Sequence, residues 1–226
     1  IFNSVGRIYS IFAVMQNPVI IFGANYLGRL AKEIFESNKV VVYGFLDDDK
    51  KLHQTEIDDV VVLGATDDEN LIKLIGKKCE SFIATDDNRL RKSLVKVLNE
   101  ERKAQPANAI HHRAIISPKS EMGHGNLVDN NVMLNVGCKV GSHNIINAST
   151  IVGVEAKLGD FVQIGASCVI GHEVVIEDDV FIGSGATIVS GIVIGKGARI
   201  GAGSVVVASV GAGETVFGNP ANKIKN

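Results

Sequence analysis

The hydrophobic pattern divides the chain into two parts with different periods. From about residue 18 to residue 104, short apolar runs such as "PVIIFG" and "VVVLG" alternate with amphipathic segments such as "YLGRLAKEIFES". The apolar residues of that amphipathic segment share one helical face: Leu27, Leu30, Ala31, Ile34 and Phe35. Buried strands that alternate with amphipathic helices predict a small parallel α/β sheet, which binds ligands beyond the carboxyl ends of its strands.

Beyond "AQPANAIHHR" the hydrophobic period changes to six. Seventeen consecutive positions at this spacing carry an aliphatic residue or methionine: Ile110, Ile116, Met122, Val128, Leu134, Val140, Ile146, Val152, Leu158, Ile164, Ile170, Ile176, Ile182, Ile188, Ile194, Ile200 and Val206. Glycine often follows, and we expect it to let the chain turn a corner. The pattern is the hexapeptide repeat of a parallel β-helix, with three hexads to a triangular coil. Coils of this class are left-handed and stack about 4.8 Å apart.

The two periods predict the fold class and the domain organisation. We expect an N-terminal Rossmann-like α/β domain followed by an all-β, left-handed parallel β-helix. Residues 1–14 are assigned to an extension, residues 15–108 to the α/β domain and residues 109–226 to the β-helix. The extension is apolar but too short to span a bilayer, and it lacks the basic start of a signal peptide. A signal peptide or a peripheral helix is the alternative interpretation.

Composition and cysteine usage exclude several classes of function. The chain has 226 residues, 46% of them hydrophobic, and a net charge of −2 without a run of Lys or Arg, so we expect no nucleic-acid or membrane partner. Cys79, Cys138 and Cys168 form no Cys-x-x-Cys pair, which argues against disulfides and zinc and favours the cytoplasm. Cys138 and Cys168 occupy small inward slots and are interpreted as core filler. His124 and His143 lack the spacing of a γ-class carbonic anhydrase, so no metal site is predicted.

The first strand of the α/β part ends in the loop "GANYLG". Gly23 and Gly28 match the outer glycines of G-x-G-x-x-G, but Asn25 replaces the middle one, so the motif is weak. A tight glycine turn that opens a helix leaves backbone N–H groups for a phosphate, or it only packs the helix on the strand. Asp47 and Asp48, about twenty residues on, stand where acids meet a ribose in doubly wound folds, or they form a solvated capping cluster.

Several segments together resemble one family. These are "FLDD" after the second strand, the helix "NRLRKSL", the junction "AIHHRAIISP" and the ending "GAGETVFGNPANKI". Over residues 18–226 the chain resembles the NeuD/PglD-type hexapeptide acyltransferases, which are bacterial sialic-acid O-acetyltransferases and nucleotide-amino-sugar N-acetyltransferases. The resemblance implies an acetyl-CoA-dependent acetyltransferase of glycan biosynthesis. We expect no metal. We also expect a homotrimer with active sites between subunits, because a smooth β-helix cannot enclose a long coenzyme alone and its three-sided cross-section suits threefold packing.

The resemblance also implies roles for individual residues. It places the nucleotide sugar, such as a UDP-amino sugar, on six residues of the α/β part: Gly23, Ala24, Asn25, Tyr26, Asp47 and Asp48. It places acetyl-CoA on six residues of the β-helix: Gln163, Gly183, Ser184, Gly201, Ala202 and Lys223.

Two histidines of the family are absent from this chain. The family's general base falls on Val154, although the acidic residue after it is kept as Glu155. The second histidine, near the thioester, falls on Gln163, which we expect to donate a hydrogen bond to the thioester oxygen. Valine accepts no proton, and general-base catalysis is worth about 10²–10⁴ in rate. The loss favours an amine as the acceptor of the acetyl group; sugar O-acetylation and a catalytically silent, nucleotide-sugar-binding relative are the alternatives.

One further histidine is a candidate replacement. His172 lies eighteen residues after Val154, one coil further on at the same corner, and Glu173 follows it. We therefore name Glu155 and His172 as the candidate catalytic pair. An exposed corner histidine without a catalytic role is the alternative.

Overall fold

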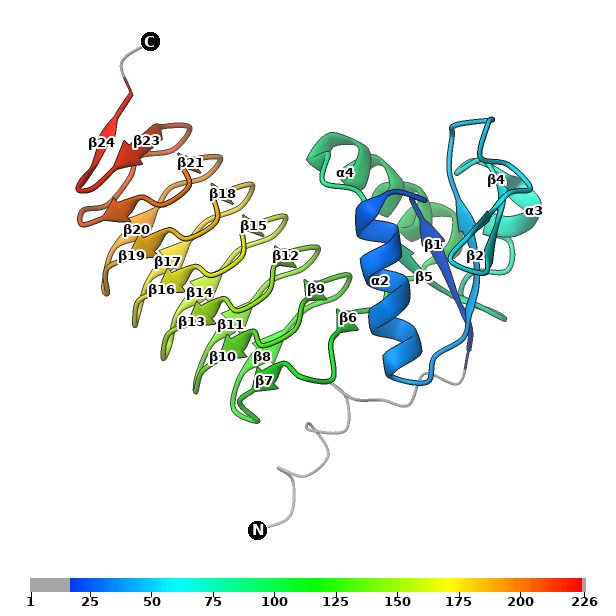
Figure 1. Ribbon diagram of the computed structural model, residues 1–226, viewed down its shortest axis with the longest axis horizontal. Coiled ribbons are helices and arrows are strands. Elements are labelled where there is room, and N and C mark those ends of the chain that lie inside the picture. Colours follow the sequence, from blue (N-terminus) through cyan, green and yellow to red (C-terminus); the bar gives the residue numbers. More distant parts are fainter. Residues whose placement is uncertain (1–16, 225–226) are drawn as a thin grey trace.

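The computed structural model describes residues 17–224, which form an α/β domain and a long prism of stacked coils (Figure 1). The extension expected at residues 1–14 lies outside the described residues. Within residues 17–224, none of the helices is both long and apolar enough to cross a membrane.

The α/β domain is a five-stranded sheet with helices on both faces. Its strand order is β3-β4-β2-β1-β5, in which β1 is parallel to β2 and β5. The strands are β1 (Val19–Phe22), β2 (Val42–Leu46), β3 (Glu56–Ile57), β4 (Val60–Gly64) and β5 (Glu80–Ile83). The helices are α2 (Tyr26–Ser37), α3 (Glu69–Ile72), α4 (Asn88–Val97) and the π-helical turn η1 (Leu98–Arg102). The predicted parallel sheet is confirmed, and a short antiparallel strand, β3, extends its edge.

The second part is the predicted parallel β-helix, with three flat faces. Face A contains β6 (Ala109–Ile110), β9 (Leu127–Val128), β12 (Ile145–Ile146), β15 (Gln163–Ile164), β18 (Phe181–Ile182), β21 (Arg199–Ile200), β23 (Thr215–Gly218) and β24 (Ala221–Lys223). Face B contains β7 (Ile115–Ile116), β10 (Met133–Leu134), β13 (Ile151–Val152), β16 (Val169–Ile170), β19 (Thr187–Ile188) and β22 (Val205–Val206). Face C contains β8 (Glu121–Met122), β11 (Lys139–Val140), β14 (Lys157–Leu158), β17 (Val175–Ile176) and β20 (Val193–Ile194).

The chain runs from face A to B to C and back to A, so the prism has three corners, called AB, BC and CA below. Strand partners lie eighteen residues apart, as where Ile151 pairs with Met133 and with Val169. An antiparallel strand, β24, pairs with β23 at the C-terminal end.

The repeated aliphatic residues fill the prism as the period predicts. All seventeen belong to the core, with Ile116 and Met122 partly buried and the others buried. Cys138 and Cys168 are fully buried beside them, which confirms that they pack in the core. Each thiol also donates to a corner carbonyl, Cys138 to Gly153 at 2.9 Å and Cys168 to Gly183 at 3.2 Å.

The glycines that follow the aliphatic residues are required at the corners for close packing between coils, and not for turning the chain as expected. The left-handed backbone conformation of corner BC falls on Glu155, with φ +57°, and not on Gly153. A Cβ on Gly153 would lie 2.6 Å from the carbonyl carbon of Gly171 in the next coil. Glycine is therefore needed at position 153 because adjacent coils approach closely there, and a non-glycine residue turns the corner.

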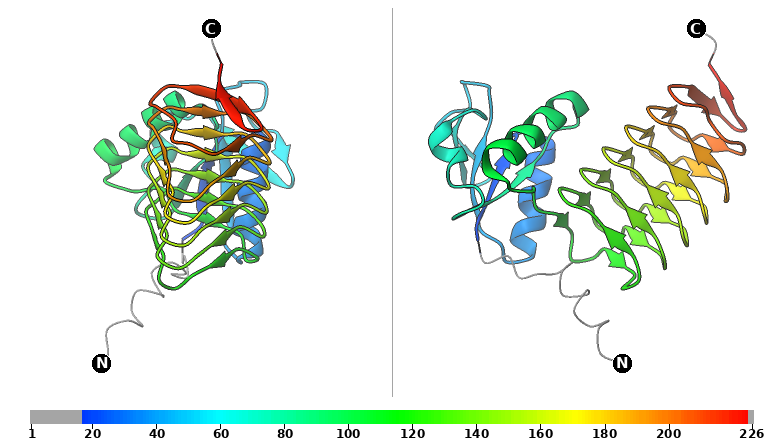
Figure 2. Two further views of the ribbon diagram at one scale, coloured as in Figure 1. Left: turned by 90° about the vertical axis from the view of Figure 1, so that its left-hand side faces the viewer. Right: turned by 180° about the vertical axis from the view of Figure 1, so that it is seen from behind.

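The α/β domain packs on the first coils of face A (Figure 2). The outward residues Ala109, Leu127 and Ile145 are buried in the same core as α2, and Asn38 at the end of α2 donates to the Ile110 carbonyl at 2.7 Å. The outward residues of the following strands, Gln163 and Phe181, face the start of α4 instead. The fold therefore brings the carboxyl end of β5 over the middle of face A.

Candidate functional site

The loop "GANYLG" connects β1 to α2 through close backbone packing. Gly23 has φ +108°, and a Cβ on it would lie 2.5 Å from the Ala84 carbonyl oxygen, while a Cβ on Gly28 would collide with the Gly23 carbonyl. Asn25 caps α2, since its Oδ1 accepts from the backbone N–H groups of Leu27 (2.9 Å) and Gly28 (3.2 Å). These contacts explain the glycines without a phosphate, so phosphate binding at this loop stays a prediction.

The two predicted acidic residues at the end of β2 differ in how many of their carboxylate oxygens accept hydrogen bonds. Asp47 accepts from the N–H of Ala24 through Oδ2 (2.8 Å) and from the N–H of Asp49 through Oδ1 (2.9 Å). Asp48 uses only Oδ1, which accepts from the N–H and the hydroxyl of Thr66, both at 2.9 Å. Of the two carboxylates, only that of Asp48 has an oxygen, Oδ2, that accepts no hydrogen bond from another described residue.

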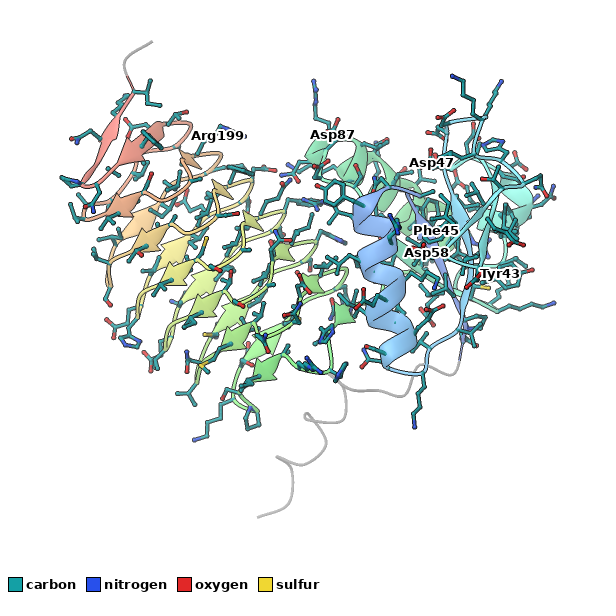
Figure 3. All side chains as sticks on the ribbon, in the orientation of Figure 1. Tyr43, Phe45, Asp47, Asp58, Asp87 and Arg199 are labelled. Atoms are coloured by element: carbon teal, nitrogen blue, oxygen red, sulfur yellow. The ribbon has the colours of Figure 1, made fainter. Side chains whose placement is uncertain are left out.

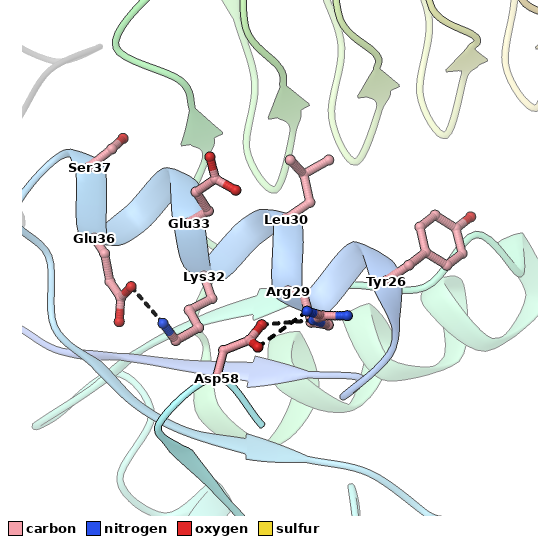
Figure 4. Close-up of a pocket in the computed structure, with 8 residues that line it drawn as sticks. All are labelled: Tyr26, Arg29, Leu30, Lys32, Glu33, Glu36, Ser37 and Asp58. Carbon is pink, nitrogen blue, oxygen red and sulfur yellow. Dashed lines mark hydrogen bonds and ion pairs between the residues drawn. The ribbon is translucent and has the colours of Figure 1, made fainter. Parts of the chain in front are cut away.

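Tyr26 links the loop to the start of α4. Helix α2 turns Tyr26, Leu30 and Glu33 toward the β-helix, whereas Arg29 points away and pairs with Asp58 at 2.7 Å (Figure 4). The Tyr26 ring is 65% exposed, and its hydroxyl donates to Asp86 Oδ2 at 2.7 Å. Partial burial and the Asp86 carboxylate raise the pKa of Tyr26 to about 12, so the phenol stays protonated and remains a donor.

Gln163, the predicted coenzyme contact, lies on face A next to residues 86–88 at the start of α4. Its Nε2 donates to the Asp86 carbonyl oxygen at 2.6 Å and to Asn88 Oδ1 at 3.0 Å. Both amide hydrogens have acceptors within the chain, so donation to a thioester oxygen, which stays a prediction, would have to replace one of these contacts. The sequence analysis does not identify Asp86 and Asn88, although "TDDN", one residue after β5, is a helix-capping signal at the carboxyl edge of the sheet.

A hollow of about 380 Å³ surrounds Gln163. Asp86, Asp87 and Asn88 line it at the start of α4, and Phe181 and Arg199 line it from face A. Figure 3 shows Asp87 and Arg199 on opposite sides of this gap. The Arg199 guanidinium lies over the Phe181 ring, 4.6 Å from its centroid. Neither residue is named by the sequence motifs, although the eighteen-residue period places the two on neighbouring strands of one face.

Corner BC carries Val154, Glu155 and His172, and there the histidine has a structural partner. His172 Nδ1 accepts from the backbone N–H of Val154 at 3.0 Å. A backbone N–H only donates, so the neutral imidazole carries its proton on Nε2. One ring nitrogen is then engaged and the other is protonated. In this arrangement His172 offers a ligand a donor and no basic lone pair.

Other corner side chains make the same contact. The N–H of Ser142 donates to Asp160 Oδ1 at 2.7 Å, and the N–H of Asp160 donates to Asp178 Oδ1 at 3.0 Å. At corner BC the N–H of His172 itself donates to the Ser190 hydroxyl at 3.0 Å. Nδ1 of His172 therefore performs a contact that serine and aspartate make elsewhere in the β-helix. This observation supports the structural interpretation of the histidine.

The predicted coenzyme residues lie along corner AB and at the C-terminal end. Gly183 and Ser184 stack below Gly201 and Ala202 of the next coil, and a Cβ on Gly183 would lie 2.5 Å from the Ala202 nitrogen. Lys223, predicted to meet a phosphate, pairs with Glu214 at 2.8 Å. A phosphate would have to compete with that carboxylate.

Face B lies between these two groups of predicted residues. Corner BC, with Val154, borders it on one side, and corner AB, with Gly183, borders it on the other. Its outward side chains include Ile115, Ile151 and Val169, which are 61%, 40% and 41% exposed. One chain thus brings Tyr26 and Gln163 close together through Asp86, but it holds corners AB and BC on opposite edges of an apolar face.

No three His, Cys, Asp or Glu side chains between residues 17 and 224 are grouped as a metal site requires.

Two family models match the sequence, one for each part of the chain. The PglD N-terminal domain model matches residues 18–98, and the bacterial transferase hexapeptide (six repeats) model matches residues 155–189 and 173–208. A search of curated proteins gives no match.

Several solved structures share the whole architecture. A variant of perosamine N-acetyltransferase from Caulobacter crescentus, in complex with CoA and GDP-perosamine, is 27% identical with a TM-score of 0.84, over 93% of this chain and 98% of that one. WeeI from Acinetobacter baumannii AYE is 28% identical with a TM-score of 0.80, over 92% and 100%. The acetyltransferase domain of PglB from Neisseria gonorrhoeae FA1090, in complex with acetyl coenzyme A, is 23% identical and shows the same fold, with a TM-score of 0.83 over 92% and 99%.

Proposed function

The chain belongs to the NeuD/PglD-type family of hexapeptide-repeat sugar acetyltransferases, and we propose that it transfers the acetyl group of acetyl-CoA to the amine of a nucleotide-linked amino sugar. Perosamine N-acetyltransferase, a structural relative at 27% identity, was solved with CoA and GDP-perosamine, a nucleotide sugar with an amino group. This relative supports N-acetylation in glycan biosynthesis. It leaves the nucleotide and the sugar of this chain open to experiment.

The main support for an amine as the acceptor is that corner BC offers no free proton acceptor on Val154 or His172. Val154 accepts no proton, and the Nδ1 lone pair of His172 is occupied by the Val154 N–H. A neutral amine already has a nucleophilic lone pair, whereas a sugar hydroxyl needs a base to remove its proton. The corner therefore suits an amine acceptor better than the O-acetylation alternative.

The proposed step needs little from the protein beyond positioning. The amine nitrogen forms a bond to the thioester carbonyl carbon, the C–S bond breaks, and CoA leaves as the thiolate. The proton lost by the nitrogen passes to the thiolate or to water. We propose His172 as a hydrogen-bond donor through Nε2–H and Glu155 as an acceptor that orients the amine. Glu155 is exposed beside Val154 and forms no side-chain hydrogen bond with another described residue.

We propose that the active site lies between subunits of a homotrimer. The exposed apolar face B separates corner BC from corner AB, so a neighbour packed on face B would bring one copy's corner BC to the other copy's corner AB. Size-exclusion chromatography with light scattering tests this, and a monomer at micromolar concentration would contradict it. Three buried, unpaired thiols and acetyl-CoA as cosubstrate support a reducing, cytoplasmic setting.

The test of function is acetylation of a panel of nucleotide sugars. The protein is incubated with acetyl-CoA and UDP-, GDP- or dTDP-linked 4-amino sugars, and each parent sugar with a hydroxyl at that carbon is the control. We expect thiol release and acetylated product with an amino sugar only. Acetylation of the hydroxyl sugars would favour the O-acetyltransferase alternative. Binding of a nucleotide sugar without turnover would favour a catalytically silent relative, which the missing imidazoles support.

A further inference from the structure

A polar network under the start of α4 joins the two domains, and Gln163 is at its centre. We propose that Gln163 is a positioning residue: it fixes segment 86–88 on the β-helix and, through Asp86, sets where Tyr26 and the nucleotide loop stand relative to the prism. The kinetic part of this inference rests on the proposed function, but its structural part does not.

The orientation of the Gln163 amide follows from its partners. One partner of Nε2 is the backbone carbonyl of Asp86, at 2.6 Å, which only accepts. Rotating the amide by half a turn would place its own carbonyl oxygen against that oxygen. The NH₂ group must therefore face α4, and Oε1 is the only polar atom of the side chain left to face the hollow.

The second partner is oriented by backbone as well. Asn88 Nδ2 donates to the Phe161 carbonyl at 2.9 Å and to Asp179 Oδ1 at 3.3 Å, so its Oδ1 must be the atom that accepts from Gln163. That Oδ1 also accepts from the Arg91 guanidinium, which is 2% exposed and further donates to the Thr85 carbonyl at 3.1 Å. Every member of the chain of hydrogen bonds thus has a defined direction.

The network continues to the predicted nucleotide loop. Asp86, whose carbonyl accepts from Gln163, also accepts the Tyr26 hydroxyl on its carboxylate at 2.7 Å. Tyr26 is the first residue of α2, directly after the cap of the loop. A single residue, Asp86, therefore connects the loop expected to hold the nucleotide with Gln163, the predicted coenzyme contact on face A.

The chemistry of the side chain makes glutamine suited to this position. It has two N–H donors on one nitrogen, and both acceptors lie within reach of that nitrogen. A neutral histidine, the family's residue here, has one N–H and cannot make both contacts. Glutamine at this position thus adds two hydrogen bonds to the contacts between the domains.

Three variants separate this role from a contact with the thioester. Gln163→Glu keeps the shape but turns a carboxylate oxygen toward two oxygens, and Gln163→Met keeps the length without hydrogen bonds. Gln105→Glu, at an exposed position of the interdomain segment, is the control for charge. We expect Gln163→Glu to raise KM for the nucleotide sugar about tenfold and Gln163→Met about threefold, with kcat and KM for acetyl-CoA unchanged within about twofold. A change in kcat or KM for acetyl-CoA alone would overturn the proposal in favour of a thioester contact.

A measurement without activity keeps the inference testable if no nucleotide sugar is acetylated. Trypsin cleaves after Arg102 and Lys103, at the start of the segment between the domains. We expect Gln163→Glu to be cleaved there at least about fivefold faster than wild type. Equal cleavage of Gln163→Glu and wild type would overturn the positioning role, whatever the outcome of the assay. Intact far-UV circular dichroism shows that each variant is folded.

Discussion

The two positions where the family carries histidine have opposite surroundings in this protein. Val154 is half-buried at corner BC, with a side chain that makes no polar contact. Gln163 lies on face A in a network that reaches Asp86, Asn88 and Tyr26. At corner BC the missing imidazole is replaced by a valine without a polar contact, whereas on face A it is replaced by a glutamine that bonds to the other domain. Restoring an imidazole at position 154 should therefore add a base, whereas restoring one at position 163 should break a contact between the domains.

The largest expected effect comes from Val154→His. The new imidazole would precede Glu155, as in the family, and we expect kcat on an amino sugar to rise by about 10². The rate should also acquire a rise with pH near 6.5, the usual pKa of histidine, because the base acts in its neutral form. Steady-state rates between pH 5.5 and 8.5 test this. An unchanged rate would mean that corner BC is not the reaction centre.

The next effect concerns His143, which lies beside the Gln163 network at corner CA. Its ring stacks on Phe161 with centroids 4.9 Å apart, and burial, together with the Arg91 charge, lowers its pKa to about 4. The unfolded chain binds this proton near pH 6.5 and the folded chain only near pH 4, so stability is lost as the pH falls through that window. We expect the free energy of unfolding to decrease by about 2 kcal/mol between pH 7 and pH 5.

Urea denaturation at the two pH values measures that decrease. His143→Gln should reduce the pH dependence without adding a charge, and His172→Gln, at exposed corner BC, is the matched control. An equal reduction in both variants would contradict the distinction between the two regions.

The smallest expected effect is that of His172. His172→Ala removes the acceptor of the Val154 N–H at an exposed corner, and we expect about 0.5–1 kcal/mol of lost stability and a change in kcat of only a few-fold. His172→Asn keeps an oxygen acceptor near the same place and should restore most of the stability. Thermal unfolding and steady-state kinetics measure both. A loss of about 10² in kcat for both variants would restore His172 as the base.

The fold was largely predictable from the sequence because its determinants are periodic. Aliphatic residues from Ile110 to Val206 specify the prism on their own, and the period also assigns each outward residue to a face. The short strand β3 and the reduction of the second helix to the four residues of α3 were not predictable in this way, because both depend on local turns.

The candidate site was less predictable because its chemistry depends on hydrogen-bond direction. The eighteen-residue spacing places His172 above Val154, but only the contact between them shows which ring nitrogen is occupied. In the same way, the sequence brings Gln163 to face A, but whether it donates to a ligand or to the protein depends on segment 86–88. Spacing determines neighbours along the prism; it does not determine what the other domain contributes.

The eighteen-residue coil also restricts how such a chain can change in length. Removing one hexad would keep every aliphatic residue inside, yet it would rotate all later coils by roughly a third of a turn and move their outward side chains to the next face. Removing a whole coil would shorten the prism and leave the identity of every face intact. Insertions or deletions of eighteen residues thus preserve both the buried aliphatic stacks and the face on which each outward side chain lies. Those of six residues preserve only the buried stacks. A β-helix of this kind can therefore gain or lose whole coils while the chemical character of each of its three faces stays the same.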